Sequence, residues 1–356
     1  MKIIVGMSGG VDSTVAALLL KEQGHDVTGV TMEIYSGGPA PDKHTNACYS
    51  PSEEDDIEFA RTVARTLGIP FYAFDLKDAY RSSVIDYITQ EYCSGRTPNP
   101  CVRCNQRLKF DVLKEKAVES GIAFDCFATG HYARVACDPE TGRYLLKKAT
   151  DKRRDQTYFL CMLSQNQLCN VLFPLGEYTK QQVRDIAKSH NLMNHDRADS
   201  QDFASGGYKG LLPQEPSGGP IKDKDGTVLG AHSGIWAYTI GQRKGLKIAR
   251  GKPLYVTAID YQNNTIYAGD EDELYKIGLV AGTANWISID ALTAPLEVKV
   301  KVRSTHADAD ALIQPEKDGT VKVTFKEPQK SLTPGQMVVF YDADRVIGGA
   351  VIEKAF

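Results

Sequence analysis

Short apolar runs alternate with amphipathic stretches through the first two hundred residues, and this alternation constrains the fold more than any other feature of the sequence. Strands are expected at 2–5, 27–32, 71–74 and 124–128, and helices at 14–23, 53–67, 80–92 and 108–119. Repeated β-α units predict an α/β fold with a doubly wound, mostly parallel sheet, whose ligands bind at the carboxyl ends of the strands. Helical patterns resume from 165 to about 191.

The composition changes after Ser205, where glycines and prolines gather as far as Pro220. Beyond this junction, alternating runs such as 298–303 and 321–325 are separated by turn residues, which predicts small β-domains. We expect three domains: an α/β domain at 1–205, a small, mostly β central domain at 206–280, and a C-terminal β-barrel at 281–356.

An overall charge of −3 excludes only wholesale nonspecific binding to nucleic acid. No stretch approaches the roughly 18 apolar residues of a membrane span, and the apolar run after Met1 is too short for a secretory signal. We therefore expect a cytoplasmic protein with no membrane partner. All eight cysteines lie within the first 169 residues, which in a reduced compartment points to metal, redox or catalytic chemistry instead of disulfides.

Residues 6–13, Gly-Met-Ser-Gly-Gly-Val-Asp-Ser, join the first expected strand to the first expected helix. The backbone N–H groups of such a turn and the positive end of the helix bind anions, although the lysine of the common phosphate loop is absent. Ser8 and Ser13 add hydroxyl groups, while Asp12 is expected to hold Mg²⁺ or to cap local N–H groups. The loop therefore suits a pyrophosphate leaving group.

The segment from Ser8 to Ser13 resembles the signature of the PP-loop ATP pyrophosphatases. These enzymes cleave ATP between the α- and β-phosphates and adenylate an oxygen of a substrate. The resemblance implies that the α/β domain at 1–205 binds ATP, but it does not identify the acceptor.

Cys101 and Cys104 form a Cys-x-x-Cys pair in a stretch that two prolines stiffen. Such a pair serves zinc, a redox dithiol or an iron–sulfur cluster, and a closed four-cysteine zinc site would need a second pair, which the sequence lacks. Asn105 is expected to cap a following helix. Because a helix N-terminus lowers the pKa of a nearby thiol, Cys104 is a candidate nucleophile or sulfur carrier.

Further motifs lie at 129–134, 154–160, 199–203, 238–246 and 333–336. Together they resemble the tRNA-specific 2-thiouridylases, the MnmA family, and the resemblance extends from Lys2 to about Ile352. It implies an ATP-dependent tRNA-uridine 2-sulfurtransferase that adenylates the C2 oxygen of uridine 34 and displaces AMP with sulfur. The implied partners are tRNA and a sulfur donor, which is a cysteine desulfurase, a persulfide carrier or sulfide.

The family resemblance also assigns roles to individual residues. It places ATP contacts at Gly6, Met7, Ser8, Gly9, Gly10, Val11, Asp12, Ser13, Met32 and Gly130, with Asp12 counted among the catalytic residues. It places the target base at Asn99, Pro100 and Cys101, and tRNA contacts at Arg154, Asp155, Gln156, Arg303 and Ser304. Ser304 stands where the family has an aromatic residue, so base stacking is not expected there. His131 either assists at the phosphates or is a structural hydrogen-bonding residue.

Two departures from the family pattern concern the sulfur step. Cys101 stands where the family has aspartate, and Ala204 stands where it has a second catalytic cysteine. Since alanine cannot carry sulfur, a relay between Cys104 and position 204 is impossible. Either Cys101, Cys104 and Cys48 bind a 4Fe-4S cluster, or Cys101 and Cys104 act as a persulfide and its resolving partner; we favour the cluster.

Locally basic segments are compatible with RNA binding despite the acidic total. Seven Lys or Arg face three acidic residues between 134 and 154, and five basic residues lie at 243–252 with no acid among them. The rival functions are another PP-loop adenylating enzyme, including a thiolase that acts at a different tRNA position, and a metal-binding RNA-interaction protein with a vestigial nucleotide site.

Overall fold

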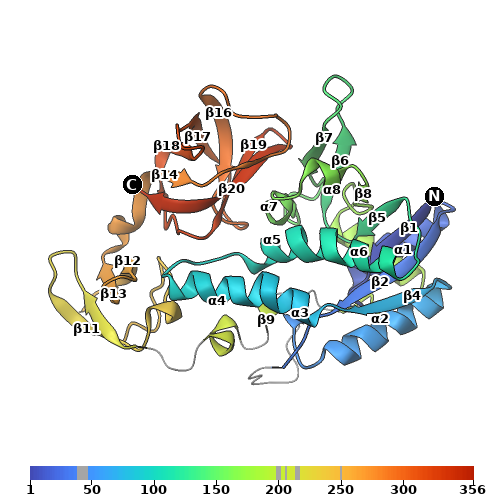
Figure 1. Ribbon diagram of the computed structural model, residues 1–356, viewed down its shortest axis with the longest axis horizontal. Coiled ribbons are helices and arrows are strands. Elements are labelled where there is room, and N and C mark those ends of the chain that lie inside the picture. The colour runs from blue at the N-terminus through green and yellow to red at the C-terminus, as the bar shows by residue number, and fades with distance from the viewer. Residues whose placement is uncertain (38–46, 198–201, 205–206, 213–216, 249–250) are drawn as a thin grey trace. The chain divides into compact units, whose positions relative to one another are not determined.

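The structure is a computed structural model that describes residues 1–37, 47–197, 202–204, 207–212, 217–248 and 251–356. It divides into two compact units, whose elements Figure 1 labels. Unit 1 comprises Met1–Ile85, Pro100–Gly210 and Asp344–Val346; unit 2 comprises Asp86–Asn99, Leu211–Ala343 and Ile347–Phe356. The three-domain division stays a prediction. Positions 199–201 of one motif and Arg250 of the second basic segment lie outside the described residues.

Unit 1 is built on a five-stranded parallel sheet with the order β4-β2-β1-β5-β8. Its strands are β1 (Lys2–Gly6), β2 (Asp26–Glu33), β4 (Phe71–Asp75), β5 (Cys126–Thr129) and β8 (Val171–Leu172). The central strand β1 pairs with β2 on one side and with β5 on the other, so the strand order reverses beside it. Such a switch point opens a crevice at the carboxyl end of the strand. Strand β1 ends at Gly6, so the crevice lies next to this residue. The predicted doubly wound, mostly parallel sheet is confirmed.

Helices and short strands complete unit 1. The helices are α1 (Val11–Glu22), α2 (Glu53–Leu67), α3 (Lys77–Tyr80), α5 (Pro100–Cys104), α6 (Leu113–Glu119), α7 (Thr157–Leu160), α8 (Gln165–Leu168) and α9 (Lys180–Ser189), with π-helices η1 (Arg81–Ile85) and η2 (Asn105–Val112) and the 3-10 turn η3 (Tyr208–Leu211). The remaining strands are β3 (Ala47–Tyr49), β6 (Ala133–Cys137), β7 (Tyr144–Lys148) and β9 (Asp202–Ala204).

The expectation of helical structure throughout 165–191 is wrong in its middle. There β8 joins the edge of the parallel sheet, and only α8 and α9 are helical. The physical reason is local: Pro174 and Gly176 follow the short apolar run and break a helix, so that run extends and pairs with β5.

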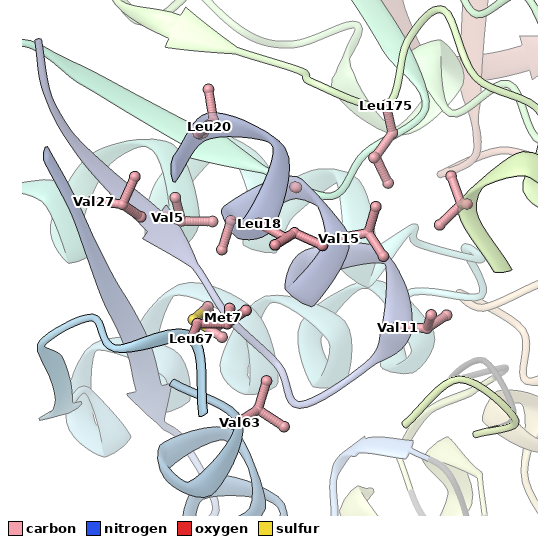
Figure 2. Packing of buried hydrophobic residues seen from close by; sticks show 14 of the residues in the cluster. Val5, Met7, Val11, Val15, Leu18, Leu20, Val27, Val63, Leu67 and Leu175 are labelled. Carbon is pink, nitrogen blue, oxygen red and sulfur yellow. The ribbon is translucent and has the colours of Figure 1, made fainter. Parts of the chain in front are cut away.

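The core of unit 1 anchors both ends of the glycine-rich loop. Figure 2 shows Val5 and Met7 packed with Val15 of α1 and with Val63 and Leu67 of α2. Full burial of one such side chain stabilises the fold by about 1.5–3 kcal/mol. Because the loop between β1 and α1 starts and ends in this core, its backbone is held in a defined position.

Unit 2 contains a closed barrel and a smaller sheet. The barrel strands are β14 (Tyr275–Ala281), β16 (Leu296–Lys301), β17 (Ala309–Pro315), β18 (Val321–Lys330), β19 (Met337–Asp342) and β20 (Arg345–Ala355), coloured orange to red in Figure 1. The ring closes because β14 pairs with both β18 and β20. Val298, Val300 and Val302 alternate inward, as the sequence predicts, and the expected C-terminal barrel is confirmed.

The other elements of unit 2 lie before the barrel strands or between them. They are α4 (Asp86–Cys93), β10 (Gly219–Lys222), β11 (Val228–His232), η4 (Ile235–Ala237), β12 (Tyr255–Asp260), β13 (Thr265–Gly269), η5 (Glu271–Leu274) and β15 (Asn285–Trp286). Strands β11, β10, β13 and β12 form a four-stranded sheet in that order. In the part of the chain that the structure describes, no helix has the length and apolarity to cross a membrane.

Candidate active site

The glycine-rich loop turns from β1 into α1 at the switch point of the sheet. Gly9 has a φ of 73°, in the left-handed region that favours glycine. Gly10 is the N-cap of α1 with an extended backbone (φ −74°), and no side-chain hydrogen bond caps the helix. The first N–H groups of a helix have no intrahelical partner, so the start of α1 offers them to an anion.

Gly130 lies directly against this loop. A Cβ at Gly130 would stand 2.6 Å from the backbone N of Ser13 and 2.7 Å from the carbonyl carbon of Asp12. Any side chain there would push the start of α1 away from the end of β5. The close approach gives a physical reason for glycine at this position, and its contact with ATP stays a prediction.

The two serine hydroxyls of the loop differ in their surroundings. Ser13 is buried, and its hydroxyl donates to the carbonyl of Gly10 (3.1 Å) while accepting from the N–H of Ser8 (3.2 Å). Ser8 is exposed. The geometry therefore assigns Ser13 to holding the turn and presents Ser8 at its surface. Met32, the remaining expected ATP contact, is half-buried in β2.

Asp12, the second residue of α1, is the counter-ion of a buried lysine. Lys180 Nζ lies 2.7 Å and 2.8 Å from the two carboxylate oxygens of Asp12, and the Tyr132 hydroxyl donates to Oδ1 at 2.9 Å. The Lys180 side chain is 9% exposed and that of Asp12 28% exposed. The carboxylate expected to hold Mg²⁺ or to cap N–H groups is thus engaged with an ammonium group.

The sequence interpretation missed both Lys180 and Tyr132. One signal was available: Lys180 is the first residue of α9, where the helix dipole disfavours a positive charge. A lysine at that position needs a compensating partner, and the partner is Asp12.

Cys48, Cys101 and Cys104 come from β3 and α5, and the structure brings them together. Cys48 and Cys101 are exposed, and Cys104 is half-buried. A negative charge on Cys48 raises the pKa of both Cys101 and Cys104, and the Lys109 ammonium lowers the pKa of both. The charges of the three thiols and of Lys109 therefore influence one another within unit 1. Their metal-binding and catalytic roles stay predictions.

The expected activation of Cys104 by a helix N-terminus is wrong. The helix begins at Pro100, so Cys104 lies inside a continuous helical stretch of α5 and η2. Asn105 does not cap it; Asn105 is buried, and its Nδ2 donates to the carbonyl of Phe159 at 3.1 Å. Burial instead raises the pKa of Cys104 to about 11, against the opposing effect of Lys109. Desolvation is also the largest cause that raises the pKa of Cys101, to about 12.

The π-helix η2 explains how Lys109 reaches the thiols. In an α-helix, a residue five positions further on is rotated by about 140° from the first. The wider turn of a π-helix, with its i to i+5 hydrogen bonds, returns the fifth residue to nearly the same side. Lys109 is the fifth residue after Cys104. Burial lowers the pKa of Lys109, but charges on Cys104, Cys48 and Cys101 outweigh it and raise that pKa.

Strand β3, which carries Cys48, pairs with strand β9, which carries Ala204. The cysteine on β3 is therefore the third thiol, next to the position that holds alanine. Tyr49 of β3 pairs with Ala204 of β9 in parallel, and both residues are buried. Cys48 precedes Tyr49 and, because successive side chains of a strand point to opposite faces, lies on the other, exposed face. From this face, a negative charge on the Cys48 thiol raises the pKa of Cys101 and Cys104.

His131 is enclosed by aromatic rings. Its ring centroid lies 5.9 Å from that of Phe110 and 6.1 Å from that of Phe173, and its Nδ1 is 2.7 Å from the hydroxyl of Thr129. Burial, assisted by Lys109, lowers the pKa of His131 to about 3. A neutral imidazole in this setting supports the structural alternative for His131.

The residues expected to contact tRNA differ in their exposure and in their hydrogen bonds within the protein. Arg154 is exposed, whereas Asp155 accepts from the hydroxyl of Thr157 (2.8 Å) and Gln156 accepts from the N–H of Tyr132 (2.8 Å). In unit 2, Arg303 follows β16 and donates to the hydroxyl of Thr333 at 3.0 Å. Ser304, the residue after Arg303, is half-buried. Of the residues expected at the target base, Asn99 is the last residue of a segment of unit 2, and Pro100 is the first residue of α5 in unit 1. Their contacts with RNA stay predictions.

A parallel sheet whose lysine-free, glycine-rich loop opens a helix at the switch point defines the class: a PP-loop, ATP-using enzyme. Three family models cover the chain. They are the tRNA methyl transferase HUP domain over residues 1–204, the tRNA methyl transferase PRC-barrel domain over 209–270, and the aminomethyltransferase beta-barrel domain over 276–352.

Full-length relatives name the family. The tRNA-specific 2-thiouridylase MnmA of Acetivibrio thermocellus is 48% identical in an alignment of 363 positions that covers 99% of each chain. That of Endomicrobium trichonymphae is 47% identical in an alignment of 356 positions that again covers 99% of each chain. The chain belongs to the tRNA-specific 2-thiouridylase (MnmA) family. A 4-thiouridine synthetase in complex with RNA and ATP matches 58% of this chain and 46% of its own at 15% identity and a TM-score of 0.34, too low to bear on function.

Proposed function

We propose that this protein is an ATP-dependent tRNA-uridine 2-sulfurtransferase that thiolates uridine 34 of tRNA. Its membership of the 2-thiouridylase family over the full length supports the substrate and the reaction. One observation carries the proposal: Cys48, Cys101 and Cys104 lie near enough to Lys109 for their charges to raise its pKa, in the same unit as the glycine-rich loop. Sulfur chemistry and nucleotide chemistry then share one fold. A tRNA substrate and free cysteine thiols both support a cytoplasmic location for the protein.

The loop serves the activation step. The N–H groups at the start of α1 bind the phosphates of ATP, with Mg²⁺ as counter-ion. The C2 oxygen of uridine forms a bond to the α-phosphorus, and the bond from that phosphorus to pyrophosphate breaks with its electron pair on the leaving group. The N3 proton passes to water. Sulfur can then attack C2, because AMP is a far better leaving group than the original oxygen.

The three thiols serve the sulfur step. Their sulfur atoms do not all lie within 4.8 Å of one another, since among the described residues no group containing them meets that limit. A single metal ion needs its ligands to converge on one point, whereas a 4Fe-4S cluster spreads its thiolate ligands over separate irons. Cys48, Cys101 and Cys104 would hold such a cluster, and the cluster would supply a site that binds sulfide for transfer to C2. Lys109 compensates the charge of the ligands.

A second route for sulfur needs no metal. Cys101 would carry a persulfide received from a cysteine desulfurase or a persulfide carrier, and Cys104 would resolve it after transfer, forming a disulfide that a reductant reopens. Cys48 has no task in this route. The two routes therefore differ in what the third cysteine does.

Contacts with tRNA are assigned to an exposed basic stretch of unit 1. Lys152, Arg153 and Arg154 are all exposed, while Asp155 and Gln156 hold this stretch through their internal hydrogen bonds. Such a group neutralises phosphates and positions RNA. In unit 2 we assign Arg303 to the same task.

The proposal is tested with protein purified without oxygen. Unmodified tRNA should stimulate exchange between ATP and pyrophosphate, and mass spectrometry should detect 2-thiouridine at position 34 after a sulfur donor is added. Exchange without thiolation at position 34 would identify another adenylating enzyme. Absence of any RNA-dependent turnover would favour an RNA-binding protein. Iron content and a visible absorption band decide between the cluster and the persulfide.

A further inference from the structure

We propose that Lys180 is the pyrophosphate-binding cation of this ATP site, supplied by α9 in place of the lysine that the glycine-rich loop lacks. This inference rests on the proposed adenylation reaction and names a residue for it. Lys180 is 7% exposed and stands at the start of α9, a helix far from the loop in sequence. Its ammonium nitrogen lies 2.7 Å from the carboxylate of Asp12.

The Lys180 ammonium group is held at the start of α1, where the phosphates are proposed to bind. Asp12 is the second residue of α1, so the carboxylate that holds the Lys180 ammonium group belongs to the first turn of the helix that follows Gly10. Asp12 is more exposed than Lys180, 28% against 9% for the side chains, so the carboxylate is the more accessible of the two groups. A ligand approaching the loop therefore meets the carboxylate first.

A purely structural ion pair explains the geometry less well. A capping box fixes the start of α9, in which Thr179 and Gln182 bond each other's backbone N–H groups. Val183 and Ala187 bury the helix in the core, and the backbone N–H of Lys180 donates to Asp151 at 3.0 Å. Since α9 is already held, the ammonium group is not needed to attach it. Placing that charge at a helix start also opposes the helix dipole.

The segment after α9 contacts the same loop. Asn194 is buried, and its Nδ2 donates to the carbonyl of Gly9 (3.0 Å) and to the hydroxyl of Thr14 (2.8 Å). Arg197 forms an ion pair with Asp56, and its Nη1 would lie 3.3 Å from a Cβ at Gly9. One stretch of chain thus brings two cations to the loop, each paired with a carboxylate.

Binding of magnesium pyrophosphate or ATP exchanges the partners. Carboxylate oxygens are preferred ligands of Mg²⁺, and ammonium groups pair with phosphate oxygens. Asp12 passes from Lys180 to the metal, and Lys180 passes from Asp12 to the phosphates, so neither charge is left buried and unpaired. During adenylation the ammonium group neutralises the charge that develops on the leaving pyrophosphate.

The test compares Lys180→Met with Lys188→Met, an exposed lysine in the last turn of the same helix. Calorimetric titration with magnesium pyrophosphate, without tRNA, should show at least a tenfold loss of affinity for Lys180→Met and less than a twofold change for Lys188→Met. The tRNA-dependent exchange rate should fall by about 10²–10³-fold in Lys180→Met alone.

Two further variants keep the test decisive. Lys180→Gln is neutral but can still hydrogen-bond Asp12, so it should fold even if Lys180→Met does not, and it should lose pyrophosphate affinity equally. Lys188→Gln makes the same change at the exposed lysine of α9, and its affinity should change less than twofold. Unchanged pyrophosphate affinity in folded Lys180→Gln overturns the inference. Failure of wild-type protein to thiolate tRNA, with these affinities as expected, would overturn only the proposed function.

Discussion

Replacing Gly130 by alanine tests the packing of the end of β5 against the start of α1. The new Cβ would lie 2.6 Å from the backbone N of Ser13, whereas ordinary contacts begin at 3.4 Å. The two backbones must therefore separate by close to 1 Å. Overpacking of this kind costs about 1–3 kcal/mol, because backbone atoms cannot rotate aside as a side chain can.

The cost should appear in both stability and ligand binding. For a unit of roughly 200 residues, each kcal/mol lowers the melting temperature by about 2–4 °C, so Gly130→Ala should melt about 2–12 °C lower. The same displacement moves Asp12 and the first N–H groups of α1 away from the phosphates. We expect ATP affinity to fall at least tenfold at a temperature where the variant is fully folded.

Calorimetry measures both quantities on the same sample. The matched control is Gly230→Ala, where the nearest atom to a new Cβ is the side chain of Ile248 at 3.4 Å. Its stability should stay within about 0.5 kcal/mol of the original. A Gly130→Ala protein that melts and binds ATP as the unaltered protein does would refute the reasoning.

Three other predictions follow from the thiols and the enclosed histidine. Cys48→Ser should abolish iron retention and thiolation, while Cys137→Ser, on an exposed part of β6, should keep both; full thiolation by Cys48→Ser would instead support the persulfide route. Lys109→Met should slow alkylation of Cys101 at pH 8 by roughly threefold or more, because the cation that lowers the pKa of that thiol is gone, and Lys116→Met on the surface of α6 should not. His131 has its folded-state pKa lowered to about 3, so the unfolded chain binds the extra proton first. Stability should then be complete above about pH 6.5 and fall by up to about 1.4 kcal/mol per pH unit below it; a His131→Gln variant whose unfolding curve keeps the same acid sensitivity would contradict this.

The sequence by itself determined the local elements and the place of the nucleotide loop. Hydrophobic periodicity and glycine positions are local properties, so the order of strands and helices around 2–128 and the barrel strands at 298–303 and 321–325 follow from them. The loop at the carboxyl end of β1 follows from the same signals. The helical expectation for 165–191 failed because a two-residue strand, β8, carries too little periodic signal to be distinguished from a helix.

Only the tertiary structure decided which charges and thiols meet. Lys180 lies 168 residues from Asp12, and in the sequence it reads as one more solvated lysine at a helix start. Cys48 meets Cys101 and Cys104 through the fold, and Lys109 faces them because five residues of a π-helix, and not of an α-helix, separate it from Cys104. Such contacts depend on how distant segments close upon one another and on how burial pairs their charges, and neither quantity is present in any local stretch of sequence.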